Sequence, residues 1–208
     1  MKRRQFVHAL FGILLLSACC GGGSPSQPSG TSVIVVLGDS IGITPLPGAA
    51  YPSMLQSRIM AASLPWTIKN QSVSGDTSAD GLARLDAVLA ENPAILILEL
   101  GGNDGLDGIG VNAIRSNLSE IITRAKAHGA RILLCGMETF PTYGPAYVAD
   151  FHDMFPALAA QFGLPLVPFV LAGVAGNPDL TSDLIHPNVA GAKVVTDNIW
   201  PYLEPMLR

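Results

Sequence analysis

Five apolar runs along the chain have the length and composition of buried β-strands. Val33–Leu37 (VIVVL), Ala94–Leu100 and Arg131–Met137 are almost continuously apolar and rich in branched aliphatic residues. Runs of this kind are typical of strands that are buried on both faces, as in parallel sheets. Trp66–Gln71 and Leu164–Phe169 are weaker candidates, and the prolines of the second favour an edge strand.

Segments with helical periodicity alternate with these runs. Leu82, Leu85 and Leu89, for example, recur at helical spacing within one of them. The pattern predicts helices at Tyr51–Ala62, Ser78–Asn92, Val111–His128, Ala146–Phe162 (with a kink or break at Pro156) and Asn188–Leu203. Alternating strands and helices predict the α/β class, here a three-layer α/β/α sandwich around a central parallel five-stranded sheet. Sites in such sheets form beyond the carboxyl ends of the strands.

Residues 1–18 have the features of a lipoprotein signal peptide rather than of a folded domain. Lys2, Arg3 and Arg4 precede an apolar stretch that is shorter than the roughly 20 residues of a membrane span. Leu16–Cys19 resembles a bacterial lipobox, which would make Cys19 the lipidated residue; an ordinary signal peptide is the alternative. The arginine pair also resembles a twin-arginine export signal.

Residues 19–32 are predicted to be a flexible tether in front of one domain, residues 33–208. The tether is rich in glycine, serine and proline, and about 12 such residues have a mean reach of roughly 20 Å. We therefore expect an exported protein that is lipid-anchored on the periplasmic side of the cell envelope. The outer membrane is favoured, because Cys20 rather than an aspartate follows Cys19.

Composition and charge narrow the possible functions. Apolar residues make up 49% of the 208 residues, which is enough for a packed core. Removal of residues 1–18 leaves nine basic and sixteen acidic residues, a net charge of −7, so no nucleic-acid partner is expected. Three cysteines do not make a disulfide framework, and no cluster has metal-ligand spacing. We expect neither a metal nor an organic cofactor.

Polar motifs follow three of the predicted strands, and another precedes the last helix. Gly38-Asp39-Ser40-Ile41-Gly42 follows the first strand and matches G-x-S-x-G, although in α/β-hydrolases several strands normally come before that motif. Gly75 follows the second strand, Gly101–Asp104 follows the third, and Asp183–His186 precedes the last helix. The carboxyl ends of parallel strands share one edge of the sheet, so these motifs can meet there.

Together and in this order, the motifs resemble those of the SGNH (GDSL-type) hydrolase superfamily. Its blocks correspond to Gly38-Asp39-Ser40 (with Ile41 where leucine is usual), Gly75, Gly101-x-Asn103-Asp104 and Asp183-x-x-His186. Ser74–Ser78, Gly81–Leu85 and Glu99–Gly105 are similar to the secreted bacterial arylesterases, also described as thioesterases and lysophospholipases. The resemblance covers about residues 33–205 and implies the flavodoxin-like sandwich of that superfamily.

The resemblance also implies a role for each motif. Ser40 would be the nucleophile, His186 the base that takes its proton, and Asp183 the group that orients the imidazole. At a spacing of three, one helical turn can present both Asp183 and His186. The backbone N–H groups of Ser40 and Gly75 and the side-chain amide of Asn103 would form an oxyanion hole.

Each of these residues also has a purely structural interpretation. Ser40 is a possible helix cap, Asn103 a possible turn residue and His186 a possible surface histidine. Asp39 and Asp104, although close to the expected site, are interpreted as hydrogen-bond partners of their own loops.

The substrate is predicted from the loops after the third and fourth strands. Leu106, Ile109, Phe140 and Tyr143 are expected to line an acyl pocket, with loop packing as the alternative. We expect a monomeric serine esterase for acyl esters such as arylesters or lysophospholipids, while the net charge of −7 disfavours anionic thioesters. The alternatives are a carbohydrate O-acetyl esterase of the same superfamily and a non-catalytic lipoprotein that binds a ligand at the Gly38–Gly42 turn.

Overall fold

Five parallel strands pair in the order β2-β1-β3-β4-β5 at the centre of the structure. The strands are β1 Ser32–Gly38, β2 Trp66–Asn70, β3 Ile95–Glu99, β4 Arg131–Cys135 and β5 Leu166–Val167. The computed structural model describes residues 31–208, so the predicted signal peptide, Cys19 and nearly all of the tether lie outside the described residues.

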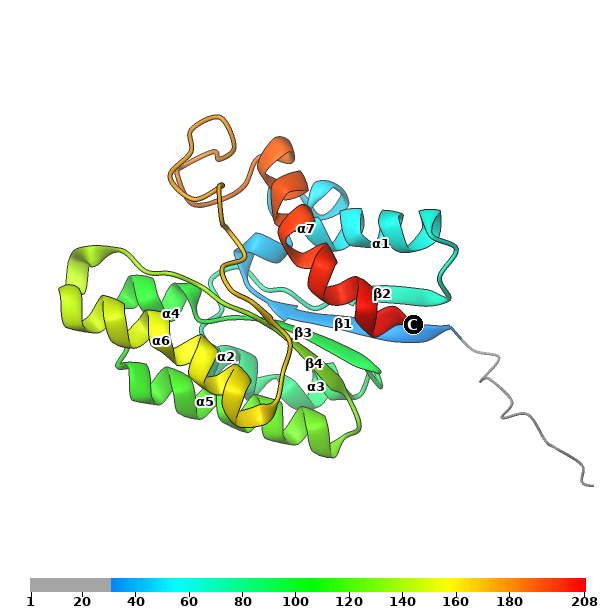
Figure 1. The fold of residues 1–208 in the computed structure, drawn as a ribbon, viewed down its shortest axis with the longest axis horizontal. Coiled ribbons are helices and arrows are strands. Elements are labelled where there is room, and N and C mark those ends of the chain that lie inside the picture. The colour runs from blue at the N-terminus through cyan, green and yellow to red at the C-terminus, as the bar shows by residue number, and fades with distance from the viewer. Residues whose placement is uncertain (1–30) are drawn as a thin grey trace, which may run out of the picture.

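Helices cover both faces of this sheet, as Figure 1 shows. They are α1 Tyr51–Ala61, α2 Ser78–Ala83, α3 Leu85–Leu89, α4 Gly102–Asp107, α5 Val111–Ala127, α6 Pro145–Phe162 and α7 Val189–Leu203. Helices α1 and α7 pack together on one face, and α2, α5 and α6 lie on the other. The predicted three-layer α/β/α sandwich is confirmed. No helix within residues 31–208 combines the length and the apolar character needed to cross a membrane.

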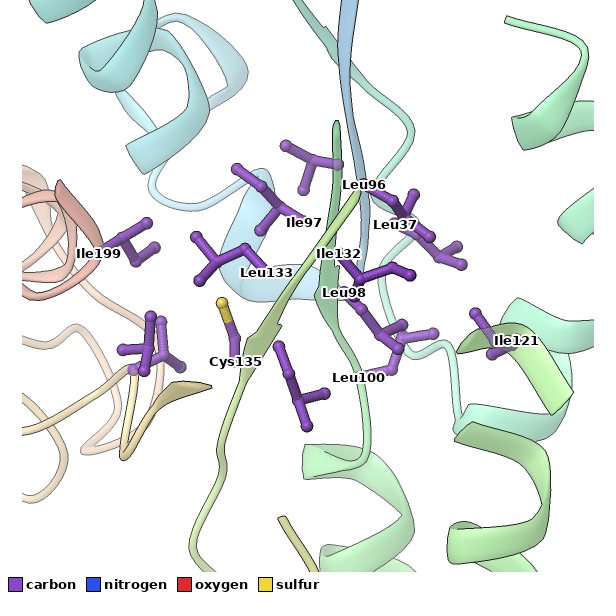
Figure 2. Packing of buried hydrophobic residues seen from close by; sticks show 14 of the residues in the cluster. Leu37, Leu96, Ile97, Leu98, Leu100, Ile121, Ile132, Leu133, Cys135 and Ile199 are labelled. Atoms are coloured by element: carbon purple, nitrogen blue, oxygen red, sulfur yellow. The ribbon is translucent and has the colours of Figure 1, made fainter. Parts of the chain in front are cut away.

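The central strands are buried on both faces, which explains their continuous apolar sequence. Figure 2 shows Ile97 of β3 on the side of Ile199 from α7, and its neighbour Leu96 on the side of Ile121 from α5. Successive strand residues point to opposite faces, so both positions must be apolar when helices cover both faces.

The strand order reverses between β1 and β3. After β1 the chain crosses to β2 at one edge, and it then returns past β1 to form β3 on the other side. Ligands of open α/β sheets bind where the strand order reverses in this way. The loops that follow β1 and β3 carry Ser40 and Asn103.

One helix prediction is wrong in detail, and one of the two outcomes expected at Pro156 is excluded. Ser78–Asn92 is not one helix, because it divides into α2 and α3 at Arg84, whose side chain bonds carbonyl oxygens outside the helix. Pro156 does not break α6. A proline removes one backbone hydrogen bond, but the buried side chains of Phe151 and Phe155 hold the helix on the core.

Helix α4 occupies a stretch that the sequence presents as a glycine-rich loop. Gly101 precedes it with a φ of 111°, a conformation that glycine adopts without strain. Asp104 stabilises this short helix from the side, because its two carboxylate oxygens accept the backbone N–H of Ser78 at 2.7 Å and the hydroxyl of Ser78 at 2.6 Å. The helix therefore depends on a contact with α2 rather than on its own propensity.

Candidate active site

The loops at the carboxyl end of the sheet bring a hydroxyl, an imidazole and a carboxylate into line. Ser40 Oγ lies 2.9 Å from His186 Nε2, and His186 Nδ1 lies 2.6 Å from Asp183 Oδ2. Ser40 begins a short 3-10 helix, η1 (Ser40–Gly42), directly after β1, whereas Asp183 and His186 lie in the loop before α7. Residues 146 positions apart thus form one hydrogen-bonded chain.

The loop of Asp183 and His186 is not the helical turn that their spacing suggested. Asp183 Oδ1 accepts the backbone N–H groups of Ile185 at 3.1 Å and His186 at 2.7 Å, an Asx-type turn. Leu184 between them has a φ of 72°, which is costly for a branched side chain. Its carbonyl accepts the N–H of Gly176, so the neighbouring loop holds this conformation.

The same contacts set the charge of Asp183. The backbone N–H and the imidazole of His186 lower the pKa of Asp183 to about 2. The carboxylate is therefore ionised throughout the neutral range, as a group that orients a histidine must be.

The turn of Ser40 is fixed by Asp39. Asp39 Oδ1 accepts the backbone N–H of Ile41 at 2.9 Å and caps η1. Asp39 itself is only 2% exposed, and this burial raises its pKa to about 6. The interpretation of Asp39 as a hydrogen-bond partner of its loop is confirmed. Asp104 is structural too, but its carboxylate bonds Ser78 of α2 and not, as the sequence predicted, its own loop.

Asn103 lies at the site with its side-chain amide already engaged. Its Nδ2 donates to the carbonyl oxygen of Asp76 at 2.9 Å and to Asp39 Oδ2 at 3.3 Å. These two acceptors fix the orientation of the amide.

Gly75 lies in the loop that Asn103 holds through Asp76. Its φ of 84° is one that residues with a Cβ rarely adopt. No atom lies within 4 Å of the position of a Cβ at Gly75, so the backbone conformation, rather than crowding, requires glycine there.

Arg84, to which the sequence motifs assign no role, connects two of these loops. Its Nε donates to Asp76 Oδ2 at 2.5 Å, and its terminal nitrogens donate to the carbonyl oxygens of Gln71 at 2.6 Å and Gly38 at 3.2 Å. The guanidinium therefore ties the end of β1, just before Ser40, to the loop that contains Gly75. An arginine followed by an apolar helix gives no local sign of such contacts.

A cavity of about 240 Å³ opens beside Ser40 and His186. Asn103 and two of the expected acyl-pocket residues, Leu106 and Phe140, belong to its lining. The lining is mainly apolar and also includes Ile41, Met137, Phe169, Leu171, Ala175 and Ile185. These six residues could not be recognised from the sequence, because their apolar side chains resemble ordinary core residues.

Ile109 and Tyr143, the other two expected pocket residues, are not part of that lining. The hydroxyl of Tyr143 donates to the carbonyl oxygen of Leu106 at 3.0 Å, and its ring lies against Gly108. Tyr143 thus supports the helix that carries Leu106. No three His, Cys, Asp or Glu side chains within residues 31–208 lie close enough to hold a metal ion together.

A parallel sheet with this strand order, and with serine, asparagine and histidine at its carboxyl end, defines the SGNH class of hydrolases. Residues 36–194 match the GDSL-like lipase/acylhydrolase family, and the chain belongs to this family. It is accordingly a hydrolase of carboxylic esters.

Several relatives are similar over nearly their whole length. Esterase TesA of Pseudomonas aeruginosa is 41% identical over 200 residues, which cover 93% of this chain and 98% of that protein. A crystal structure of TesA has a TM-score of 0.79 and covers 84% of this chain and 99% of its own. Thioesterase 1/protease 1/lysophospholipase L1 of Escherichia coli K12 is 34% identical over 185 residues, covering 87% and 88%. The psychrotrophic esterase EstA from Pseudoalteromonas sp., inhibited by monoethylphosphonate in its crystal structure, is 30% identical with a TM-score of 0.79, covering 85% and 98%.

Proposed function

We propose that Ser40, His186 and Asp183 hydrolyse acyl esters through a covalent acyl-enzyme. The observation that carries this proposal is the hydrogen-bonded chain from Ser40 Oγ through the imidazole to Asp183, at the edge of an apolar cavity. A serine hydroxyl is a weak nucleophile until a base takes its proton, and the 2.9 Å contact provides that base.

The reaction takes place in two matched halves. Ser40 Oγ attacks the ester carbonyl carbon while His186 Nε2 takes the hydroxyl proton, which gives a tetrahedral intermediate. The bond to the alcohol oxygen then breaks, and the imidazolium returns the proton to the leaving alcohol. Water repeats the sequence on the acyl-enzyme and releases the carboxylic acid. Asp183 remains ionised and stabilises the imidazolium in both halves.

The negative charge on the carbonyl oxygen requires preset donors. We assign this role to the backbone N–H groups of Ser40 and Gly75 and to Asn103 Nδ2. The position of Asn103 in the cavity lining and the glycine-specific backbone at residue 75 support the assignment. Loss of one such donor typically lowers kcat by about 100- to 1,000-fold.

The apolar cavity favours an ester with a hydrophobic acyl chain. Leu106, Phe140 and Phe169 offer such a chain an apolar surface, and apolar side chains form most of the lining. The names of the relatives, esterase and lysophospholipase, agree with arylesters or lysophospholipids as substrates. The same acyl transfer also cleaves thioesters.

We also propose that the enzyme is exported and anchored to a membrane by a lipid on Cys19. The N-terminal sequence supports this proposal: three basic residues, Lys2, Arg3 and Arg4, precede a short apolar stretch and the Leu16–Cys19 motif. Metabolic labelling with palmitate tests it: the wild type should take up label and Cys19→Ala should not. Equal labelling of both would contradict the anchor.

A single comparison tests the nucleophile. Wild type, Ser40→Ala and the control Ser116→Ala, at an exposed position on α5, are assayed with p-nitrophenyl esters. We expect Ser40→Ala to lose measurable turnover and covalent labelling by a fluorophosphonate probe, and the control to keep both. Turnover by Ser40→Ala at the wild-type rate would overturn the proposal.

A further inference from the structure

A buried carboxyl lies directly behind the nucleophile turn and takes no part in the steps above. Glu99, the last residue of β3, is paired with Gly38 in the register of β1 and β3. A Cβ added at Gly38 would lie 2.5 Å from Glu99 Oε2. The carboxyl group of Glu99 therefore packs directly on the backbone of Gly38, where only glycine leaves room for it. Glu99 is fully buried, and neither of its carboxyl oxygens makes a hydrogen bond of good geometry within the described residues. The backbone N–H of Asp39 and the hydroxyl of Tyr51 are close enough to oppose the rise of its pKa, but burial has the larger effect.

Asp39, the residue after Gly38, is buried beside it in a very different setting. Both of its oxygens accept hydrogen bonds, Oδ1 from the N–H of Ile41 and Oδ2 from the amide of Asn103. Donors to a carboxyl group favour its ionised form, whereas burial without donors favours the neutral form. Neighbouring buried carboxyls do not both ionise near neutral pH. The geometry therefore gives the negative charge to Asp39 and the proton to Glu99.

The protonation preferences agree with this division. Burial, and next the negative charge of Asp39, raise the pKa of Glu99 well above its ordinary value. Burial raises the pKa of Asp39 to about 6, while the N–H of Ile41 opposes the rise. At neutral pH, Asp39 is ionised and Glu99 retains its proton.

Other titratable groups also face this pair. Tyr51 from α1 and Cys135 from β4 lie towards Glu99, and burial raises the pKa of both, so each is neutral at neutral pH. His186 and Asp76 act on Asp39 from the loops, with opposite electrostatic effects on its pKa. Asp76 is paired with Arg84, so its charge is largely compensated.

We propose that Glu99 is a positioning residue whose neutral carboxyl leaves Asp39 ionised, so that Asp39 can hold both the turn of Ser40 and the amide of Asn103. This proposal rests on the roles proposed above for Ser40 and Asn103. Glu99 touches no substrate atom and acts only through Asp39. An ionised Glu99 would favour protonation of Asp39, and two catalytic groups would lose their common acceptor.

Three substitutions separate charge, polarity and volume at this position. Glu99→Gln keeps the shape and the neutral, polar character, and we expect its kcat to stay within about threefold of the wild type, because no charge is lost. Glu99→Leu keeps the volume but removes the polar group. We expect its kcat to fall about tenfold with KM changed less than about twofold, because an apolar neighbour disfavours the Asp39 charge. Glu120→Gln and Glu120→Leu, at an exposed position on α5, are the matched controls.

The pH profile distinguishes positioning from simple packing. Protonation of Asp39 should contribute an acid limb in kcat/KM near its pKa of about 6. In Glu99→Leu this limb should move to higher pH, and Glu99→Gln should restore it. In an Asp39→Asn background, Glu99→Leu should cause little further loss, since the group through which it acts is already neutral.

Infrared spectroscopy would detect the proton on Glu99 directly. Wild type at neutral pH should show the carbonyl stretch of a buried protonated carboxylic acid, and Glu99→Gln should lack it. An identical band in both proteins would overturn the proposal. So would a Glu99→Leu variant with wild-type kcat and an unchanged acid limb, or a Glu99→Gln variant as impaired as Glu99→Leu.

Failure of the proposed nucleophile is detected separately. The infrared measurement needs no turnover, and fluorophosphonate labelling of Ser40 reports on that residue alone. If Ser40→Ala hydrolyses esters normally, the function proposed above fails. If Ser40 labels normally but the Glu99 variants behave like the Glu120 controls, only the positioning proposal fails.

Discussion

Arg84 and Asp76 form a close ion pair behind the loop that carries Gly75, with Arg84 Nε 2.5 Å from Asp76 Oδ2. The same guanidinium also donates to the carbonyl oxygens of Gln71 and Gly38. Because the pair is largely buried, its geometry is protected from solvent, unlike that of the surface pairs elsewhere on the chain. Two of the proposed oxyanion donors therefore have their relative position set by one side chain.

Arg84→Lys should separate the two loops while keeping the positive charge. A lysine ammonium has no planar fork and cannot reproduce three divergent hydrogen bonds. We expect kcat to fall by roughly 10- to 100-fold, with a smaller change in KM, because donors that stabilise the transition state are displaced. The control is Arg124→Lys, which alters an exposed pair with Asp86. Steady-state kinetics that show equal effects for both variants would contradict this role.

Asn103→Ala removes a proposed oxyanion donor. We expect kcat to fall about 100- to 1,000-fold, while KM changes little, since the lost hydrogen bond strengthens only in the transition state. Asn112→Ala, at an exposed position on α5, is the control. A loss of less than about threefold would mean that the amide contributes only its contacts with Asp39 and Asp76.

Asp183→Asn should leave the loop in place and lower kcat by up to about 10,000-fold, because a neutral amide cannot fix the histidine tautomer or stabilise the imidazolium. Circular dichroism checks that the variant is folded, and p-nitrophenyl ester turnover measures the loss. Near wild-type activity would show that another group orients His186.

The lowered pKa of Asp183 also predicts a pH dependence of stability. The folded-state pKa of Asp183, about 2, lies below its ordinary value of 3.8. The stabilising contribution of Asp183 to the free energy of unfolding is therefore present above pH 3.8 and is lost as the pH falls through about 2. The carboxylate is half-exposed, so solvent screening keeps the effect small. Thermal unfolding of wild type and Asp183→Asn should therefore differ at pH 5 and converge near pH 2. A difference in unfolding temperature that stays the same at both pH values would contradict the lowered pKa of Asp183.

Phe140→Ala should alter the preference for acyl-chain length. Phe140 lines the cavity, and its removal enlarges the space next to the reacting carbon. We expect kcat/KM to shift towards longer p-nitrophenyl esters by about 10-fold, since each buried methylene group contributes about 0.8 kcal/mol. Met60→Ala, at an exposed position on α1, is the control. An unchanged chain-length profile would place the acyl chain elsewhere.

The architecture could be predicted from the sequence because burial on two faces leaves a clear pattern. The apolar runs around Leu96 and Leu133 identify central strands without any tertiary information. The motifs of Ser40 and Asn103 could be placed at one edge of the sheet, because they follow strands that must be parallel. His186 precedes the last helix, so only the resemblance to SGNH hydrolases placed it with them.

Contacts between distant segments left no comparable pattern. Arg84 bonds residues 8, 13 and 46 positions away, and Glu99 is notable only because the strand register places it against Gly38. The cavity residue Phe169 also looks like any apolar core residue in the sequence. These roles depend on three-dimensional neighbours, which periodicity and short motifs do not encode.

The direction of β1 has a consequence for how the enzyme would face a bilayer. Ser32 starts β1 at the end of the sheet opposite the Ser40 loop, as Figure 1 shows, and seven strand residues span roughly 20 Å. A lipid on Cys19 would therefore join the domain at the end of the sheet opposite the cavity, through a flexible tether with a mean reach of roughly 20 Å. Such a tether would let the mouth of the cavity turn either towards the leaflet that anchors the enzyme or towards the surrounding aqueous compartment.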